Sequence, residues 1–172
     1  AVSVRSLRFP VPCPDPAMRP RHTVVVHLLV ESGGRVLLLQ RAGTGRADGC
    51  WAPPGGHLEP GETPLAGALR ECEEELRITV PTAHARPLAT VVFDEGPAAP
   101  VGLNLLFGAR LPAAVDPHPD PACASAAGWF DRDGLPQPAV PWLADALARL
   151  AAVDDHGVDG SPWYGQSCPI LK

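Results

Sequence analysis

Several features are scarce or absent in this sequence of 172 residues, and each absence excludes a class of protein. There is one Lys beside thirteen scattered Arg, so the chain lacks the Lys/Arg stripe that binds nucleic-acid phosphates. No apolar run approaches the roughly 20 residues of a membrane span. We therefore expect neither a nucleic-acid partner nor a membrane partner.

The cysteine pattern excludes two further classes. The five Cys are odd in number and widely spaced, and no two of them form a Cys-x-x-Cys pair, which argues against a disulfide framework and a zinc ribbon. A reduced chain is the simpler interpretation, and no signal segment with a basic start and an apolar stretch is visible. The sequence therefore predicts a cytoplasmic protein, and its length fits one domain with a buried core.

Runs of apolar and β-branched residues predict strands separated by turns. The first two form a hairpin around Ser32-Gly33-Gly34, and the Pro- and Gly-rich segment 51–62 is predicted to consist of turns. Four strands and one short extended segment are predicted: 23–30, 35–41, 87–95, 101–111 and Trp129–Phe130.

Two amphipathic helices are predicted. The first begins at Pro64 after the N-cap residue Thr63. Its buried face is marked by apolar residues spaced four, three and four apart: Leu65, Leu69, Cys72 and Leu76. The second spans about residues 141–153, with three leucines on one face: Leu143, Leu147 and Leu150. Strands and helices in this order indicate a layered α/β or α+β domain.

Acidic charge is concentrated in one window. Residues 59–75 hold six of the eight Glu, no Asp and a single base, so this window carries the −5 net charge of the whole chain. On the first helix, Glu71, Glu74 and Glu75 share one face, and nothing is expected to neutralise them there. Three carboxylates on one face would supply oxygen ligands for a hard cation such as Mg²⁺ or Mn²⁺. The simpler alternative is a solvated acidic face.

The segment 56–78, GHLEPGETPLAGALRECEEELRI, resembles the Nudix box, Gly-x5-Glu-x7-Arg-Glu-U-x-Glu-Glu-x-Gly-U, in which U is apolar. All fixed polar positions match, and Arg77 replaces the last Gly, which normally supplies a left-handed helix stop. The segments 51–56 and 129–136 also resemble the family. The resemblance to the Nudix (MutT-like) family spans about residues 21–153, between a Pro-rich arm at 1–20 and a tail at 154–172 that is expected to be irregular.

The resemblance implies an α/β/α sandwich with a mixed β-sheet. It also implies a Mg²⁺- or Mn²⁺-dependent hydrolase that cleaves the diphosphate bond of a nucleoside diphosphate linked to another moiety, a small-molecule nucleotide substrate. Many relatives dimerise, so a homodimer is a further candidate state. The substrate is not readable from the sequence.

The same resemblance assigns roles at the box. The metal ligands would be three side chains and one backbone carbonyl: Glu71, Glu74, Glu75 and Gly55. Arg70 would hold a carboxylate by a bidentate pair, with Glu62 or Glu71. Either Glu71 or Glu74 would be the general base, which makes the catalytic set Glu71, Glu74 and Arg70. Glu62 and Gly56 would support the site.

Other candidates stand outside the box. A late acid from a loop would be Asp120, with Asp116 or Glu95 as alternatives, and a plain loop Asp is an equally good interpretation. Arg41, at the end of the second strand, would contact substrate phosphate or be an exposed strand-end Arg. The remaining residues singled out are interpreted as structural or solvent-facing: His27, Trp51, Glu59 and Glu73.

Two alternatives to a hydrolase remain at this point. One is a catalytically silent Nudix-fold domain that binds nucleotides or regulates, although such domains typically lose the acidic residues that this box keeps. The other is an acidic protein-interaction helix on an unrelated α/β fold.

Overall fold

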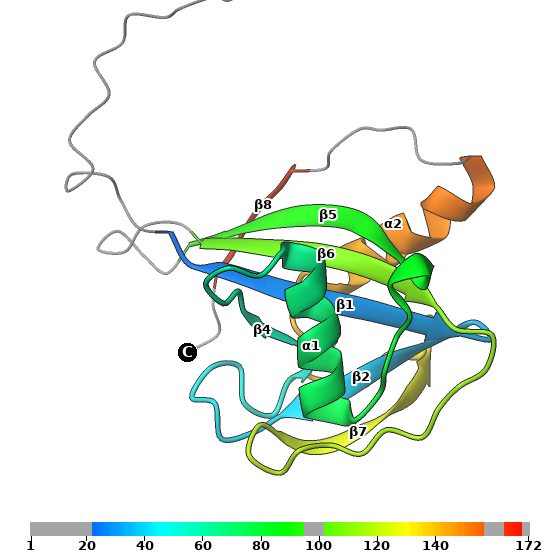
Figure 1. The fold of residues 1–172 in the computed structure, drawn as a ribbon, viewed down its shortest axis with the longest axis horizontal. Coiled ribbons are helices and arrows are strands. Elements are labelled where there is room, and N and C mark those ends of the chain that lie inside the picture. Colours follow the sequence, from blue (N-terminus) through cyan, green and yellow to red (C-terminus); the bar gives the residue numbers. More distant parts are fainter. Residues whose placement is uncertain (1–21, 95–101, 157–163, 170–172) are drawn as a thin grey trace, which may run out of the picture.

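The computed structural model describes residues 22–94, 102–156 and 164–169, in which one mixed sheet lies between two helices (Figure 1). The strands are β1 Val24–Ser32, β2 Arg35–Arg41, β3 Trp51–Ala52, β4 Gly55–His57, β5 Ala85–Asp94, β6 Gly102–Arg110, β7 Ala124–Asp131 and β8 Tyr164–Pro169. The helices are α1 Pro64–Leu76, α2 Leu143–His156 and a short 3₁₀ turn, Thr82–His84. The predicted α/β/α sandwich with a mixed sheet is confirmed.

β1 is the centre of the sheet, because its apolar run is buried along almost its whole length. The strand order is β3-β2-β1-β6-β5-β8, with β7 paired to β2 and β4 paired to β1. β1 runs parallel to β6 and antiparallel to β2 and β4. A strand that is covered on both faces in this way can be apolar at every position, as β1 nearly is.

One edge of β1 is shared by two strands. β2 pairs with it only next to the hairpin turn, at Glu31 and Ser32, whereas β4 pairs with it at the other end, from Val25 to His27. The predicted hairpin is confirmed, and its turn uses Gly33 and Gly34 at positive φ. Because β2 leaves β1 after the turn, β4 has room to enter the sheet beside α1.

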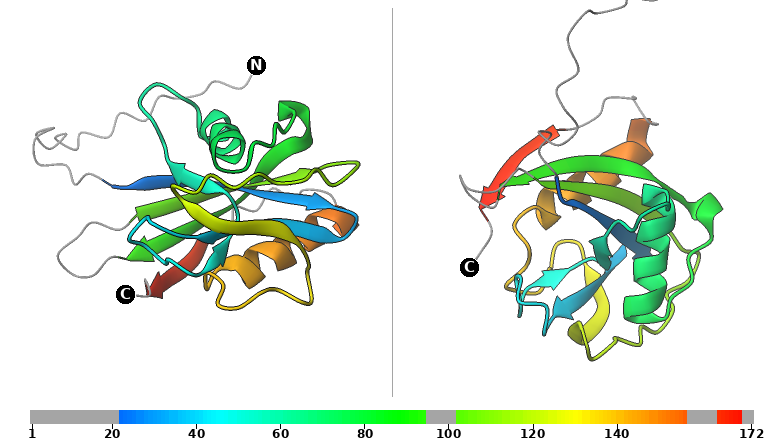
Figure 2. Two further views of the ribbon diagram at one scale, coloured as in Figure 1. Left: turned by 90° about the horizontal axis from the view of Figure 1, so that it is seen from below. Right: turned by 60° about the vertical axis from the view of Figure 1, so that its left-hand side comes forward.

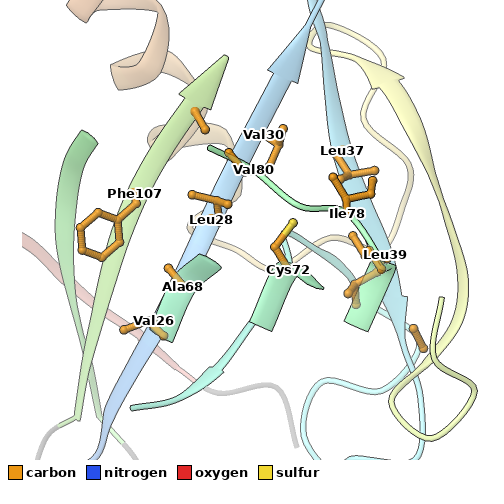
Figure 3. Close-up of a cluster of buried hydrophobic side chains, with 13 residues drawn as sticks. Val26, Leu28, Val30, Leu37, Leu39, Ala68, Cys72, Ile78, Val80 and Phe107 are labelled. Atoms are coloured by element: carbon orange, nitrogen blue, oxygen red, sulfur yellow. The ribbon is translucent and has the colours of Figure 1, made fainter. Parts of the chain in front are cut away.

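The alternation of β1 side chains divides the core into two parts. Val26, Leu28 and Val30 face α1, whereas Leu29 faces α2. Figure 3 shows the α1-side core, which includes Cys72 of the helix. The two helices lie on opposite faces of the sheet in Figure 2. Four residues of α2 complete the other core: Leu143, Ala146, Leu147 and Leu150.

α1 begins as predicted and ends with an unexpected residue. Thr63 is the N-cap, and its Oγ1 accepts a hydrogen bond from the Ala66 N–H at 3.3 Å. Arg77 takes the left-handed conformation at φ 57° and ψ 33°, and its N–H donates to the Glu73 carbonyl at 2.9 Å. Arginine therefore makes the helix stop that glycine makes in the Nudix box, at a conformational cost of about 1–2 kcal/mol.

Three predictions from the sequence need correction. Segment 51–62 contains the short strands β3 and β4, and β7 extends well beyond Trp129–Phe130. The expected irregular tail at 154–172 contains the end of α2 and the strand β8, which pairs with β5. These strands are short or poor in β-branched residues, so only pairing with their neighbours makes them strands. The predicted arm at 1–20 lies outside the described residues.

The other predicted elements, α1, α2, β5 and β6, are confirmed within the described residues. Among the described helices, none is both long and apolar enough to cross a membrane.

Candidate active site at the α1 carboxylates and the β4 cavity

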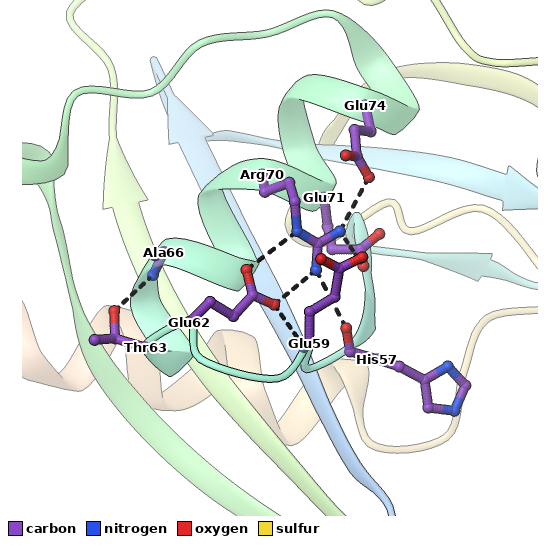
Figure 4. Close-up of polar contacts among 8 residues, drawn as sticks. All are labelled: His57, Glu59, Glu62, Thr63, Ala66, Arg70, Glu71 and Glu74. Carbon is purple, nitrogen blue, oxygen red and sulfur yellow. Dashed lines mark hydrogen bonds and ion pairs between the residues drawn. The ribbon is translucent and has the colours of Figure 1, made fainter.

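Arg70 lies in the middle of a carboxylate cluster on α1 (Figure 4). Its Nε and Nη2 donate to the two oxygens of Glu62 at 3.1 and 2.8 Å. Its Nη1 donates to Glu71 at 2.9 Å and to Glu74 at 3.0 Å, and Nη2 also donates to the His57 carbonyl at 3.2 Å. The expectation that nothing neutralises this face is therefore wrong for Glu71 and Glu74, which the Arg70 guanidinium joins to Glu62.

Glu62 is the bidentate partner of Arg70. It also accepts the Glu59 N–H at 2.7 Å, and the hydrogen bonds from Arg70 and then from Glu59 lower its pKa. A Cβ at Gly67 would lie 2.7 Å from Glu62 Oε1, so glycine leaves room for the carboxylate beside the helix. Glu62 in turn is the main reason why the pKa of Arg70 is raised. This pair fixes the guanidinium near Glu71 and Glu74.

Glu71 reaches from α1 to the backbone of β4. A Cβ at Gly56 would lie 2.4 and 2.7 Å from its two carboxylate oxygens, so the carboxylate lies against the strand where the glycine has no side chain. Burial raises the pKa of Glu71, against the opposing effect of Arg70. Arg70 therefore offsets only part of the cost of burying the charged Glu71 carboxylate.

Glu75 is the most buried of the box glutamates, with 8% of its surface exposed. Its Oε2 accepts the Gly55 N–H at 2.9 Å. Burial raises the pKa of Glu75 to about 7, with the Gly55 hydrogen bond acting in the opposite direction and the charge of Glu71 adding to the rise. Glu71 and Glu75 thus place two carboxylates against two successive residues of β4.

The donor set fits a hard divalent cation. Carboxylate and carbonyl oxygens are the ligands that Mg²⁺ prefers, and a cation would relieve the charge that burial disfavours on Glu71 and Glu75. Within the described ranges, no three His, Cys, Asp or Glu side chains already converge as a metal site. Glu74 is half exposed and is drawn toward Arg70, so it would exchange this partner for the cation.

A cavity of about 190 Å³ opens beside β4 on the α2 side of the sheet. It touches Gly55 and Gly56, the two residues that the glutamates reach from α1. The aromatic side chains in its wall are His27, His57, Phe93 and Trp142. The buried Asn104 also lines it. The cavity and the carboxylate cluster are therefore joined through one three-residue strand.

Arg41 lies between the cavity and the carboxylates. It lines the cavity, and its positive charge adds to the lowering of the His27 pKa by burial and partly opposes the rise in the Glu75 pKa that burial causes. Its Nε donates to the Arg46 carbonyl at 3.0 Å and its Nη2 to Thr44 Oγ1 at 3.2 Å, so the loop after β2 holds the guanidinium in place.

Comparison with known proteins identifies the family. The NUDIX domain family model matches residues 20–150. The chain belongs to the NUDIX family.

Three relatives show how far the likeness extends. Human 8-oxo-dGDP phosphatase NUDT18 is 30% identical over 131 residues, which are 75% of this chain and 38% of NUDT18. Bovine m7GpppN-mRNA hydrolase NUDT17 is 43% identical over 58 residues, 33% of this chain and 19% of NUDT17. The MutT NUDIX hydrolase of Burkholderia pseudomallei superposes with a TM-score of 0.67 at 28% identity, over 76% of this chain and 98% of that protein. The chain thus spans well under half the length of the two curated relatives.

The candidates for a late loop acid of this NUDIX chain are Asp120, Asp116 and Glu95. Asp120 lies at the end of α1, where its N–H donates to the Glu75 carbonyl at 2.8 Å and its carboxylate is 3.9 Å from the Arg77 guanidinium. Asp116 is exposed, and Glu95 lies outside the described residues. Of the three, Asp120 is the one shown beside the helix that carries the glutamates.

The sequence did not reveal the cavity wall of this NUDIX domain. Phe93, Asn104 and Trp142 come from β5, β6 and the segment before α2, and no spacing in the chain connects them. The aromatic part of this wall is formed only when these elements meet. The one available signal was His27, a polar residue within the apolar run of β1.

Proposed function

We propose that this NUDIX chain is a metal-dependent hydrolase that cleaves the diphosphate bond of a nucleoside diphosphate linked to another moiety. One observation carries the proposal: Glu71 and Glu75 lie against Gly56 and Gly55 of β4, and the same two glycines border the cavity. A nucleotide in the cavity would thereby bring its phosphates to the carboxylate cluster.

The residues of the site divide the chemistry among them. A divalent cation bound by Glu71, Glu74, Glu75 and the Gly55 carbonyl would neutralise phosphate charge and activate water. Arg70, fixed by Glu62, orients Glu71 and Glu74. Glu71 or Glu74 accepts the proton of the attacking water as general base. Arg41 contacts a phosphate oxygen, and Asp120 is the candidate late acid.

The cavity supports a nucleoside as the bound part of the substrate. Trp142 and Phe93 provide apolar aromatic surface for a base, and Asn104 provides a buried donor and acceptor. The names of NUDT18 and NUDT17 describe enzymes that act on a nucleoside diphosphate and on a capped mRNA. A nucleoside polyphosphate substrate agrees with both the cavity and these relatives.

A catalytically silent nucleotide-binding domain is the second candidate. It is favoured by one observation, that Arg70 binds Glu71 and Glu74 at the same time and thereby occupies two of the proposed metal ligands. Such a domain would bind nucleotide in the cavity without hydrolysing it.

Further expectations belong to the same proposal. The proposed cation is Mg²⁺ or Mn²⁺, and the proposed hydrolase domain comprises residues 21–153. The proposed location is the cytoplasm, and we expect neither a nucleic-acid nor a membrane partner. The described Cys50, Cys72 and Cys123 are free thiols, which agrees with a reducing compartment. A homodimer is the proposed assembly, and size-exclusion chromatography with light scattering tests it.

The experiment is a phosphate-release screen across nucleoside triphosphates, nucleotide sugars and dinucleoside polyphosphates with Mg²⁺ and Mn²⁺. For an active substrate, Glu71→Gln and Glu74→Gln should each lower kcat at least about 100-fold. Glu73→Gln is the matched control, because Glu73 is exposed on the same helix and bonds Thr79 instead. Activity that is equal in all four proteins would refute the hydrolase, and nucleotide binding without turnover would support the silent domain.

A further inference from the structure

His27 occupies the junction between the cavity and β4. It is 6% exposed, lines the cavity, and is paired in the sheet with Gly55. Its ring contacts Trp142 with 4.9 Å between the ring centroids and a tilt of 52°. The ring is therefore enclosed by the cavity wall and by the strand that the glutamates reach.

The contact of His27 with Gly55 depends on the glycine. A Cβ at Gly55 would lie 2.3 Å from His27 Nδ1, 2.7 Å from its Cγ and 2.2 Å from the Val26 carbonyl oxygen. The imidazole thus fills the space that a side chain at Gly55 would need. Nδ1 is buried without a hydrogen bond of ordinary geometry, although neighbouring backbone carbonyls and the Asn104 side chain interact with the ring and partly oppose the lowering of its pKa by burial.

Gly55 also contacts the carboxylate cluster. Its N–H donates to Glu75 at 2.9 Å, and its carbonyl is a proposed metal ligand. A continuous series of contacts therefore runs from Trp142 through His27 and Gly55 to Glu75. Any movement of the imidazole changes the room available to the Gly55 backbone.

We propose that His27 is a positioning residue: its ring sets the place of the Gly55 backbone, and through it the carboxylate of Glu75 and the geometry of the metal site. The inference rests on the proposed function, since it concerns the same cation. His27 itself touches neither the cation nor the reacting phosphate. A nucleotide that stacks on Trp142 affects the geometry of the metal site through the His27 ring.

The test measures Mn²⁺ affinity by electron paramagnetic resonance of the free ion, which needs no turnover. His27→Ala should bind Mn²⁺ about 10-fold more weakly than the wild type, the usual loss when a group that orients metal ligands is removed. The matched control is Leu29→Ala, which removes a buried side chain from the same face of β1 but borders neither β4 nor the cavity. It should lose stability and keep the wild-type Mn²⁺ affinity.

Two further variants separate positioning from loss of stability. His27→Phe keeps a flat ring against Gly55 and should recover most of the Mn²⁺ affinity, whereas His27→Gln has no ring and should not. His27→Gln also replaces His27→Ala as the test if the alanine variant does not fold. Equal Mn²⁺ affinity in the wild type, the tested His27 variant and Leu29→Ala would overturn the role of His27 alone. Failure of the wild type to bind Mn²⁺ or to hydrolyse any substrate would overturn the proposed function itself.

Discussion

The two faces of the sheet are each covered by one helix, but the helices contribute in different ways. α1 carries the charged groups itself, with Arg70 and four of the box glutamates within a single stretch of chain. α2 contributes mainly apolar side chains to the core, and the cavity on its side is lined from several separate elements. The first face is suited to holding a cation, and the second to holding the organic part of a substrate.

This difference explains why the carboxylate site could be predicted from the sequence and the cavity could not. A helix places its own residues at fixed positions, so the spacing of Glu71, Glu74 and Glu75 carries the chemistry in the sequence alone. A cavity depends on which strands become neighbours. The comparison also predicts a kinetic division: changes on the α1 face should lower kcat, and changes on the α2 face should raise KM.

The largest effect is expected from Glu75→Gln. This change removes the charge of the buried carboxylate but keeps an acceptor for the Gly55 N–H, so the fold should persist. We expect kcat to fall about 100-fold or more with little change in KM, because the lost group acts on the cation. Steady-state kinetics with saturating Mg²⁺ gives both constants. A rise in KM with unchanged kcat would contradict the prediction that changes on the α1 face lower kcat.

A smaller loss is expected from Gly56→Ala. The new Cβ would lie 2.4 Å from a Glu71 oxygen, and the flexible end of that side chain is what must move. We expect kcat to fall about 10- to 100-fold from the displaced carboxylate, with a small change in Tm. Gly128→Ala in β7 is the control, since its Cβ would meet Phe130 at an ordinary 3.5 Å. Equal kcat in the two variants would contradict the placement of Glu71.

On the α2 face, Trp142→Ala should raise KM about 10-fold and leave kcat within about threefold, because it removes aromatic surface from the cavity wall. Trp129→Ala is the matched control. Trp129 packs in the α1-side core and donates to the Val115 carbonyl at 2.9 Å, so its loss should affect stability but not KM. An unchanged KM in Trp142→Ala would show that the substrate binds elsewhere.

The smallest effect concerns pH and His27. Burial and the charge of Arg41 lower the pKa of His27 to about 4, below its unfolded value, so the unfolded chain binds a proton first as pH falls. The native state should therefore lose about 1 kcal/mol of stability between about pH 7 and pH 5.5 from this residue.

The pKa of Glu75, raised to about 7, acts in the opposite direction over the same range, because the native state then binds the extra proton, and the raised pKa of Glu71 acts with the same sign. The comparison of wild type with His27→Phe in metal-free urea unfolding isolates the titration of the histidine, because Phe keeps a ring against Gly55 but binds no proton. Parallel pH profiles of the two proteins would contradict a buried neutral imidazole.

Much of the fold followed from local patterns, and the exceptions have physical causes. Thr63 and the apolar spacing of α1 predicted that helix because capping and amphipathicity are local. β3 and β4 were missed because they are only two and three residues long, lie beside Pro53 and Pro54 and, in β4, begin with two glycines, so that pairing with β2 and β1 is what makes them strands. The pairing of Arg70 with Glu62 was anticipated through the family resemblance, whereas the neutralisation of Glu71 and Glu74 by the same guanidinium was not.

The central claim is that the glutamates of α1 form a divalent-cation site at β4. Titration of Mn²⁺ into the wild type, Glu71→Gln and Glu73→Gln tests it most directly, because each variant differs from the wild type at one position of the same helix. We predict that the wild type and Glu73→Gln bind Mn²⁺ equally and that Glu71→Gln binds at least about 10-fold more weakly. Equal binding by all three proteins, or no binding by the wild type, would contradict the account.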